Sequence, residues 1–335
     1  MNAETDSVES YVARSTAHSA WTCPVCDQAQ KRRRIAEIIW RTQIPGPTHY
    51  DIVRCSNCDV VATDPMPSRG VLDAYYASYD PTAIDEYRET KLVSMQAPLW
   101  SYLRGFVRTQ GKPSILDYGF GAGAFLKHVS ATGGVRAFGA DFSEQNLGQL
   151  RQWSAASGVP IETFNAGAGR VPEFVTERMD LITMFQVVEH LVDPVAVIRD
   201  LGSVQHAGGL LYIECPHQDA WFFRAKNHFR RLLSREFMYG SVSPPQHVLG
   251  FNRRSLTALL ERCGYRTLEV GDYSVADGVH APETVAWYPT PWEWLTHPEK
   301  RTPLGFGKAI IRVIDVPLSR MFGVGGGLFA LAVRV

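Results

Sequence analysis

The chain has 335 residues, of which 45% are hydrophobic, and its 34 basic and 34 acidic side chains leave no formal net charge. This length and apolar content are enough for one main domain with its own core plus an appendage. The balanced charge disfavours nucleic-acid binding through a broad basic field, and no apolar run reaches the ~18 residues that a membrane span needs.

The first segment, residues 1–18, is polar and has no hydrophobic periodicity, which indicates a disordered N-terminus. Its start, Met1–Asp6, is acidic and lacks the basic and apolar regions of a signal peptide. We therefore expect a soluble, cytoplasmic protein without a transmembrane segment.

Four of the six cysteines form two C-x₂-C pairs that are separated by 28 residues. Two such pairs on tight knuckles supply the four thiolates of a tetrahedral zinc site, and they leave no open coordination position. With strand-like stretches at 34–40 and 50–54, this predicts a structural zinc ribbon over residues 19–63. The alternatives are disulfides, which a reducing cytoplasm disfavours, or a ribbon without metal. The predicted zinc ligands are Cys23, Cys26, Cys55 and Cys58.

A linker follows at 64–111, where Leu72 and several tyrosines recur at helical spacing. We expect this segment to cap the mouth of a ligand site, with Tyr76 and Tyr79 facing the substrate. Ordinary packing explains Tyr75 equally well.

The stretch 115–126 reads as a short apolar strand, a turn with glycine at every second position, and a helix. Glycine lets backbone amides approach a ligand closely, because no Cβ stands in the way. Asp141 comes 18 positions after Gly123, at the end of the next strand, where it can accept both hydroxyls of a ribose. This pattern indicates an adenosine-containing cofactor in a Rossmann-like site; the alternative is a glycine-rich turn that binds nothing.

The spacing of this turn is G-x-G-x-G, whereas dinucleotide sites use G-x-G-x-x-G and hold a pyrophosphate at the helix N-terminus. Asp117 precedes the glycines. A carboxylate in this place repels a pyrophosphate and attracts a cationic group.

Two more strand-like segments follow, at 179–185 and at 208–216. Between them stands the sequence QVVEHLVDP, in which Asp193 can cap a helix that has Pro194 at its first position. Further on, 252–264 shows a helix with an N-cap and an apolar stripe.

The C-terminal part contains two strands, 266–270 and 327–335. The insertion 271–326 between them is rich in tryptophan and proline and includes an amphipathic stretch, 309–314. It suits a substrate wall, a dimer contact or a membrane-surface patch, and the sequence does not choose among these.

In this order, the blocks resemble the motifs of class I S-adenosylmethionine (SAM)-dependent methyltransferases. The glycine turn is similar to their D-x-G-x-G-x-G loop, and residues 189–194 are similar to the EHL-x-DP segment of the small-molecule branch. Tyr118 and Phe120 stand where that family often has smaller residues. The resemblance covers roughly 112–270. It implies an α/β fold with a Rossmann-like, seven-stranded sheet whose last strand is antiparallel, in a domain over 112–335.

The resemblance also implies SAM as the cofactor. The cofactor-binding residues that it implies are Asp117, Gly119, Gly121, Gly123, Asp141, Phe142, Asn165, Ala166, Phe185 and Gln186.

Catalytic groups should come from loops at the carboxyl ends of the strands. His190, His217 and His247 stand in such loops, and histidine can accept a proton near neutral pH. His190 and His247 could instead bridge backbone groups beside the pocket, whereas the sequence offers no structural partner for His217.

The run 224–235 carries five basic residues and no acidic one. Arg230 and Arg231 are therefore candidates for binding a phosphate or carboxylate of the substrate, and a solvated helical face is the alternative.

Three functions follow from these features. The first is a methyltransferase acting on a small molecule, for which an anionic sugar, lipid or natural-product intermediate is a candidate. The second is an RNA methyltransferase whose zinc ribbon, with the basic run Lys31–Arg34, serves as a binding arm. The third is a non-catalytic SAM-binding protein. Nothing in the sequence names the acceptor, the methylated atom or the oligomeric state.

Overall fold

The computed structural model describes nine stretches of the chain, 21–29, 31–39, 49–77, 96–167, 169–228, 238–274, 291–296, 303–322 and 324–335. The expected disordered segment 1–18 lies outside these residues, as do Tyr79, Arg230, Arg231 and the side chain of Tyr76.

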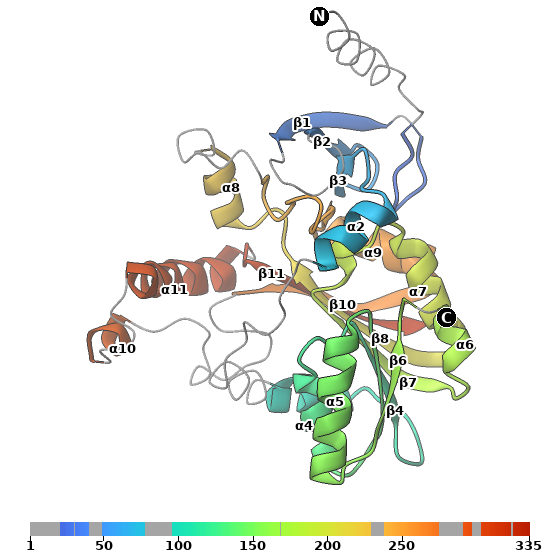
Figure 1. Cartoon of the computed structure of the whole chain (residues 1–335). Coiled ribbons are helices and arrows are strands. Elements are labelled where there is room, and N and C mark those ends of the chain that lie inside the picture. The colour runs from blue at the N-terminus through green and yellow to red at the C-terminus, as the bar shows by residue number, and fades with distance from the viewer. Residues whose placement is uncertain are drawn as a thin grey trace, which may run out of the picture.

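A seven-stranded sheet forms the centre of the molecule, in the order β10-β11-β8-β7-β4-β5-β6 (Figure 1). Only β11 runs antiparallel to its neighbours, so the expected class I methyltransferase sheet is confirmed. Because β5 lies on one side of β4 and β7 on the other, the strand order reverses at β4, which is where such sheets bind ligands. The strands are β4 (Ser114–Tyr118), β5 (Arg136–Asp141), β6 (Ile161–Asn165), β7 (Met179–Phe185), β8 (Gln205–Pro216), β10 (Tyr265–Tyr273) and β11 (Gly327–Arg334).

Helices cover both faces of this sheet, and for that reason all five residues of β4 are buried. Ile115 points to the face covered by the helix at 96–104 and by α4 (Ala124–Ala131). Leu116 points to the opposite face, covered by α7 (Pro194–Ser203) and α9 (Arg253–Arg262). The remaining helices of this domain are α5 (Glu144–Ser157), beside α4, and α6 (Val171–Phe174).

The predicted helix starts are confirmed. The Asp193 side chain accepts a hydrogen bond of 2.9 Å from the Ala196 amide at the start of α7, and Pro194 is its first residue. The side chain of Asn252 caps α9 through the Ser255 amide. Each cap satisfies a backbone donor that the first helical turn leaves without a partner.

A second, antiparallel sheet has the order β1-β2-β3-β9. Its first three strands, β1 (Arg32–Ile39), β2 (His49–Cys55) and β3 (Val61–Asp64), belong to the predicted ribbon. The fourth, β9 (Leu249–Gly250), comes from the domain of the seven-stranded sheet and pairs with β3. The side chain of Arg262 on α9 also donates a hydrogen bond of 2.8 Å to the Val25 carbonyl. The ribbon therefore lies against α9 rather than standing apart, which the sequence did not indicate.

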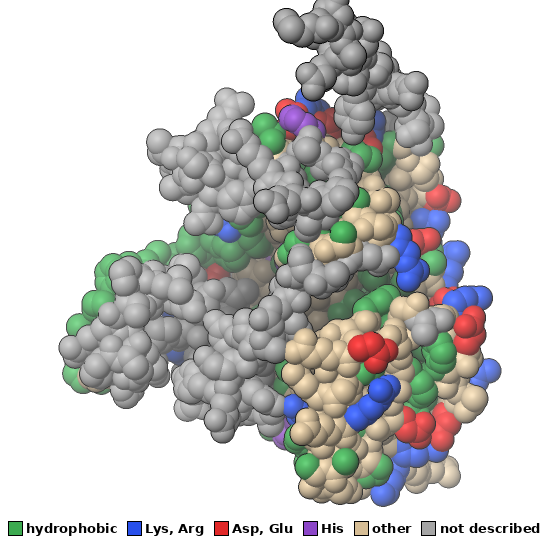
Figure 2. All heavy atoms as spheres, viewed as in Figure 1, with side chains coloured by type: hydrophobic (Ala, Val, Ile, Leu, Met, Phe, Trp, Pro, Cys, Tyr) green, Lys and Arg blue, Asp and Glu red, His purple; other side chains and the backbone are tan. Residues whose placement is uncertain are grey.

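The long helix α11 (Pro303–Phe322) contains the predicted amphipathic stretch and leads into β11. Its buried Asp315 accepts a hydrogen bond of 2.7 Å from the Trp221 indole at the start of α8 (Trp221–His228). Figure 2 shows hydrophobic side chains gathered over α11, in agreement with the exposure of Ile310 and Val313. No helix in the described part of the chain is long and apolar enough to cross a membrane. Three short elements complete the fold, α2 (Arg69–Ala77), η2 (Val188–His190) and α10 (Pro291–Thr296).

Candidate active site

The three glycines of the loop after β4 have φ angles of +75°, +55° and +72° at Gly119, Gly121 and Gly123. Residues other than glycine rarely adopt positive φ angles of this size. A Cβ on Gly119 would also lie 2.5 Å from a methyl carbon of Val187. A Cβ added to Gly121, by contrast, would have no neighbouring heavy atom within 4 Å. The loop thus presents an uncovered stretch of backbone at the switch point of the sheet.

Asp141, at the end of β5, is tied to this loop. Its carboxylate accepts hydrogen bonds from the amides of Gly121, at 2.9 Å, and Ser143, at 2.8 Å, and from the Asn146 side chain. Burial nevertheless raises its pKa above the ordinary value. The next residue, Phe142, has 57% of its surface exposed and stands edge-on to Tyr118. A carboxylate and an exposed ring beside the glycine loop suit the ribose and the base of an adenosine.

Two further carboxyl groups, one buried and one half-buried, lie at the same edge of the sheet. Asp117 is 1% exposed and accepts a hydrogen bond of 2.8 Å from the Thr183 hydroxyl. Burial, together with the charges of Asp141 and Glu214, raises the pKa of Asp117 to about 7. Burial also raises the pKa of Glu214 to about 7, against the hydrogen bond of 2.8 Å from the Tyr212 hydroxyl.

Within the described residues, no lysine or arginine forms an ion pair with Asp117, Asp141 or Glu214. Buried carboxylates without a cation are costly, and they are normally paired or neutralised. A ligand that carries positive charge compensates them. SAM carries a sulfonium and an ammonium group, so the residues present fit this cofactor.

The remaining predicted cofactor residues lie around the same edge but have partners of their own. Asn165 donates to the Glu144 side chain and accepts a hydrogen bond from the Gly167 amide. The Ala166 amide donates to the Asp141 carbonyl. The Phe185 ring lies in an aromatic group with Phe125 and Tyr212, and Gln186 has a φ of +56°. Their contact with a cofactor stays a prediction.

The three predicted histidines separate into two groups. The rings of His190 and His247 stand edge to face with their centroids 4.6 Å apart. His217 is held elsewhere, between β8 and β11, where its Nδ1 lies 3.1 Å from the Gly325 carbonyl oxygen. The structure thus gives His217 the partner that the sequence did not reveal. Burial lowers the pKa of all three, to about 3 for His190, so they are neutral at physiological pH.

Glu189 is the polar residue that the sequence analysis did not select. It is 1% exposed, and neither oxygen of its carboxyl group has a hydrogen-bond partner. Burial raises its pKa to about 8. One of its oxygens lies within 4.8 Å of a ring nitrogen of His190 and of His247. The EHL motif pointed to this position, but only the fold brings His247 to it.

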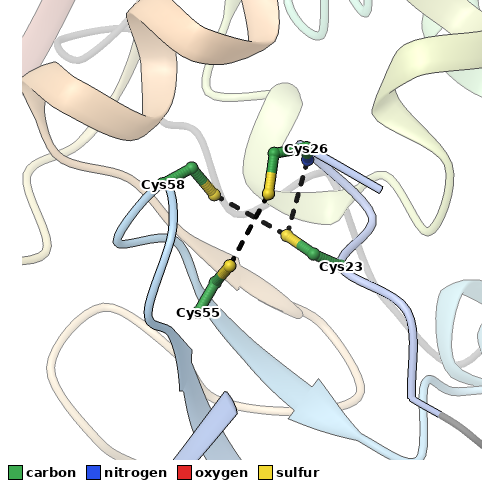
Figure 3. A group of neighbouring side chains, drawn as sticks. All are labelled: Cys23, Cys26, Cys55 and Cys58. Carbon is green, nitrogen blue, oxygen red and sulfur yellow. Dashed lines mark hydrogen bonds between the residues drawn. The ribbon is translucent and has the colours of Figure 1, made fainter. Parts of the chain in front are cut away.

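Figure 3 shows the four predicted cysteine ligands pointing toward a common centre. The Cys23 and Cys58 sulfurs are 3.6 Å apart, as are those of Cys26 and Cys55, and none forms a disulfide. A zinc ion with four sulfurs at 2.3 Å in a tetrahedron holds them about 3.8 Å apart. The cluster therefore has the ligand number and size of a structural zinc site.

Two of the four basic residues in the run Lys31–Arg34 of the ribbon form ion pairs. Arg32 pairs with Asp64, and Arg34 pairs with Asp51 at 2.6 Å. Figure 2 shows basic and acidic side chains mixed over the visible face rather than a continuous basic surface. These pairs do not favour the use of the ribbon as an RNA-binding arm.

Comparisons with known proteins agree with the fold. A family model described as a methyltransferase domain matches residues 85–270, more than half of the chain. The ubiquinone biosynthesis O-methyltransferase of Rhizobium rhizogenes is 28% identical over 139 residues, which are 40% of this chain and 55% of that protein. The enzyme of the same name from Parvibaculum lavamentivorans is 33% identical over 132 residues, 39% and 49% respectively. The chain thus spans about half the length of these relatives.

Among solved structures, the magnesium protoporphyrin IX methyltransferase of Synechocystis PCC 6803 is similar, with a TM-score of 0.45 and 12% identity. The alignment covers 79% of this chain and 94% of that one. At this identity and TM-score, the likeness bears on neither the acceptor nor the mechanism. The family match covers the glycine loop, the carboxylates and the buried strands, and this chain belongs to the family of SAM-dependent methyltransferases that carry the methyltransferase domain.

Proposed function

We propose that the protein methylates a hydroxyl oxygen of a small molecule, with SAM bound along the glycine loop and a zinc ion as a structural element. The observation that carries the cofactor site is a group of carboxylates that no cation compensates in the described part of the chain: the buried Asp117 and Asp141 and the half-buried Glu214.

SAM, when bound, supplies a methyl group on a positively charged sulfur. In this proposal Asp141 accepts the ribose hydroxyls, Phe142 lies against the adenine, and the open backbone at Gly121 lets the ligand approach. Asp117 and Glu214 face the positively charged part of the cofactor. These groups would hold the cofactor in one orientation, which in-line methyl transfer needs.

The acceptor, on this proposal, lies beside η2, where Glu189, His190 and His247 form a buried polar cluster. Methylation of a hydroxyl requires a group that takes its proton, and a carboxyl or imidazole group with a suitable pKa can do so. Two relatives carry the name O-methyltransferase, which supports oxygen as the methylated atom. An anionic acceptor bound by Arg230 and Arg231 stays a prediction.

The zinc ion would stabilise this region indirectly, through the ribbon. The ribbon pairs β3 with β9, and the amide of Val248, directly before β9, donates to the Glu189 carbonyl at 2.9 Å. The four cysteines therefore stabilise the framework on which the acceptor cluster is built, without contributing to the chemistry themselves.

The cofactor part is tested with Asp141→Ala and calorimetry of SAM and S-adenosylhomocysteine. Hydrogen bonds to a charged group contribute ~1.5–3 kcal/mol each, so affinity should fall at least ~10-fold. Asp200→Ala, which removes a surface partner of Arg170, is the matched control and should bind normally. Unchanged affinity in Asp141→Ala would exclude the proposed ribose contact.

The acceptor part is tested by incubating the protein with SAM that carries an isotopically labelled methyl group and a panel of small hydroxylated, amino and RNA acceptors. Mass spectrometry should find the label on oxygen of a small molecule. Label on nitrogen, on carbon or on RNA would replace the proposal with another acceptor class.

A further inference from the structure

The buried carboxyl group of Glu189 has an unusual environment. Its side chain is 1% exposed, and both of its oxygens are shielded from solvent without a hydrogen-bond donor. Leaving such a group without a partner destabilises the folded state, and buried carboxylates in native proteins are normally paired or coordinate metal ions. The described residues therefore give this carboxyl group no partner, and a ligand can complete the site.

Two imidazole rings converge on the same place. His190 Nε2 lies 3.9 Å from a Glu189 oxygen, and one donor atom from each of Glu189, His190 and His247 lies within 4.8 Å of the others. The three side chains come from two segments, η2 and the loop before β9, which the pairing of β9 with β3 holds together.

Backbone carbonyl groups fix the orientation of both rings. His190 Nδ1 lies 3.0 Å from the Gln246 carbonyl oxygen, and His247 Nδ1 lies 2.9 Å from the Ser241 carbonyl oxygen. A carbonyl oxygen only accepts hydrogen bonds, so Nδ1 of each ring carries a hydrogen, and Nε2 of His247 keeps its lone pair. Metal-binding histidines are commonly oriented in this way, with the distal nitrogen on a backbone carbonyl. The Gln186 carbonyl also accepts a hydrogen bond from the His190 ring, so a metal ion at this ring would compete with that carbonyl.

We infer that Glu189, His190 and His247 bind one divalent transition-metal ion, separate from the four-cysteine site. Two imidazoles and a carboxylate suit ions such as zinc, manganese, iron or cobalt. Three ligands on one side leave positions for solvent or for an oxygen of the acceptor. This inference rests on the proposed function only for the identity of that oxygen.

A metal ion at this site would determine which acceptors can be methylated. A cation at this place attracts a hydroxyl or phenol oxygen and lowers its pKa, because it stabilises the deprotonated form. The favoured acceptor is then one with two neighbouring oxygens, which can occupy two open positions on the ion. A proton on Glu189 or a trapped water is the competing way to complete the site.

The probe is Co²⁺, added to protein whose cysteine site is already loaded with zinc and which has been freed of weakly bound ions. We expect saturation at one equivalent, with ligand-field absorption and without the sulfur-to-cobalt charge-transfer bands that exchange into the four-cysteine site produces. No binding, or binding only with sulfur bands, would overturn the inference.

Variants distinguish the proposed metal ligands from residues outside the site. Glu189→Gln and His247→Ala should each weaken Co²⁺ binding at least ~10-fold, whereas Glu189→Asp, which keeps a carboxylate, should retain measurable binding. His206→Ala is the control, because that ring is partly exposed and pairs with Asp180 at 3.2 Å, away from the cluster. Equal affinity in Glu189→Gln and wild type would refute the proposed ligand set. Should Glu189→Gln not fold, the wild-type titration still decides the question.

Binding of S-adenosylhomocysteine to the same samples keeps the two proposals apart. If methyl transfer is not the activity, the Co²⁺ site is still expected to form. If the metal site is absent, cofactor binding and oxygen methylation are still expected, with a proton or water at Glu189.

Discussion

Arg54 and Asp219 lie 165 positions apart in the sequence, and their side chains form an ion pair of 2.9 Å. Arg54 directly precedes the zinc-ligand candidate Cys55, and Asp219 follows β8 by three residues. Asp219 also accepts a hydrogen bond of 2.8 Å from the Asn252 side chain, at the start of α9. This pair therefore joins the ribbon to the loop after β8.

Arg54→Ala should destabilise the protein by ~1–3 kcal/mol, because it removes a hydrogen bond to a charged group that is mostly shielded from solvent. Urea unfolding of wild type, Arg54→Ala, Asp219→Asn and the double variant measures the coupling between the two side chains. Arg254→Ala, which removes the more exposed pair with Asp59, is the control and should change stability less. A coupling near zero would contradict the structural role of the pair.

The same pair gives stability a defined pH dependence. Burial would raise the pKa of Asp219, but hydrogen bonds from Arg54 and Asn252 outweigh it and lower the pKa below the ordinary 3.8. A carboxylate with a lowered folded-state pKa adds stability above its unfolded pKa and loses it as pH falls through the folded value. The difference between wild type and Arg54→Ala should therefore be constant near neutrality and shrink below about pH 4.

Metal analysis tests the four-cysteine site. Protein purified without chelator should contain one zinc in this site, and Cys55→Ser should lose it, because a structural site needs all four thiolates. The loss should lower stability by at least ~2 kcal/mol and expose the ribbon to proteolysis, while the main sheet still folds. Cys215→Ala, a buried cysteine outside the cluster, should keep the metal. Intact zinc in Cys55→Ser, or disulfides in the wild type, would refute the assignment.

The glycine loop offers a paired test of fold against function. Gly121→Ala adds a methyl group to open space at a φ of +55°, so it should cost only ~1–2 kcal/mol of stability but weaken SAM binding. Gly119→Ala adds the same strain and a 2.5 Å clash with Val187, so it should be the less stable variant. Thermal unfolding with and without SAM separates the effects, and Val187→Ala should partly rescue Gly119→Ala. Equal stability of the two glycine variants would contradict this packing.

Cofactor affinity should depend on pH through Asp117 and Glu214, whose pKa values burial raises to about 7. Asp117 faces Thr183 and Asp141, and Glu214 faces the hydroxyls of Tyr212 and Tyr273. A raised pKa keeps these carboxyl groups protonated below neutrality, whereas a cationic ligand binds the ionised form better.

SAM affinity should therefore rise between pH 6 and pH 8, by about 10-fold for each proton released on binding. Calorimetry in buffers with different ionisation enthalpies measures that release. S-adenosylhomocysteine, which lacks the sulfonium charge, should show a weaker dependence, and Glu214→Gln should reduce it for SAM. Identical pH profiles for the two ligands would refute the electrostatic fit.

Features that depend on near neighbours could be predicted from the sequence. Glycine is required at Gly119, Gly121 and Gly123 because the turn itself imposes positive φ angles. The helix starts at Asp193 and Asn252 depend on a cap and an amide three residues on. The cysteine knuckles each close within four residues, and the apolar runs of β4 and β7 predicted strands.

Features that depend on packing between distant segments could not be predicted from the sequence. His247 reaches Glu189, 58 positions earlier, because β9 pairs with β3 and sets the register of the loop before it. His217 finds its carbonyl partner at Gly325 because β11 inserts beside β8. The sequence by itself determined the family, the cofactor loop and the cysteine set, since these are local patterns of chemistry and backbone geometry. Only the tertiary structure decided which polar groups are buried together, because that depends on how separate elements pack.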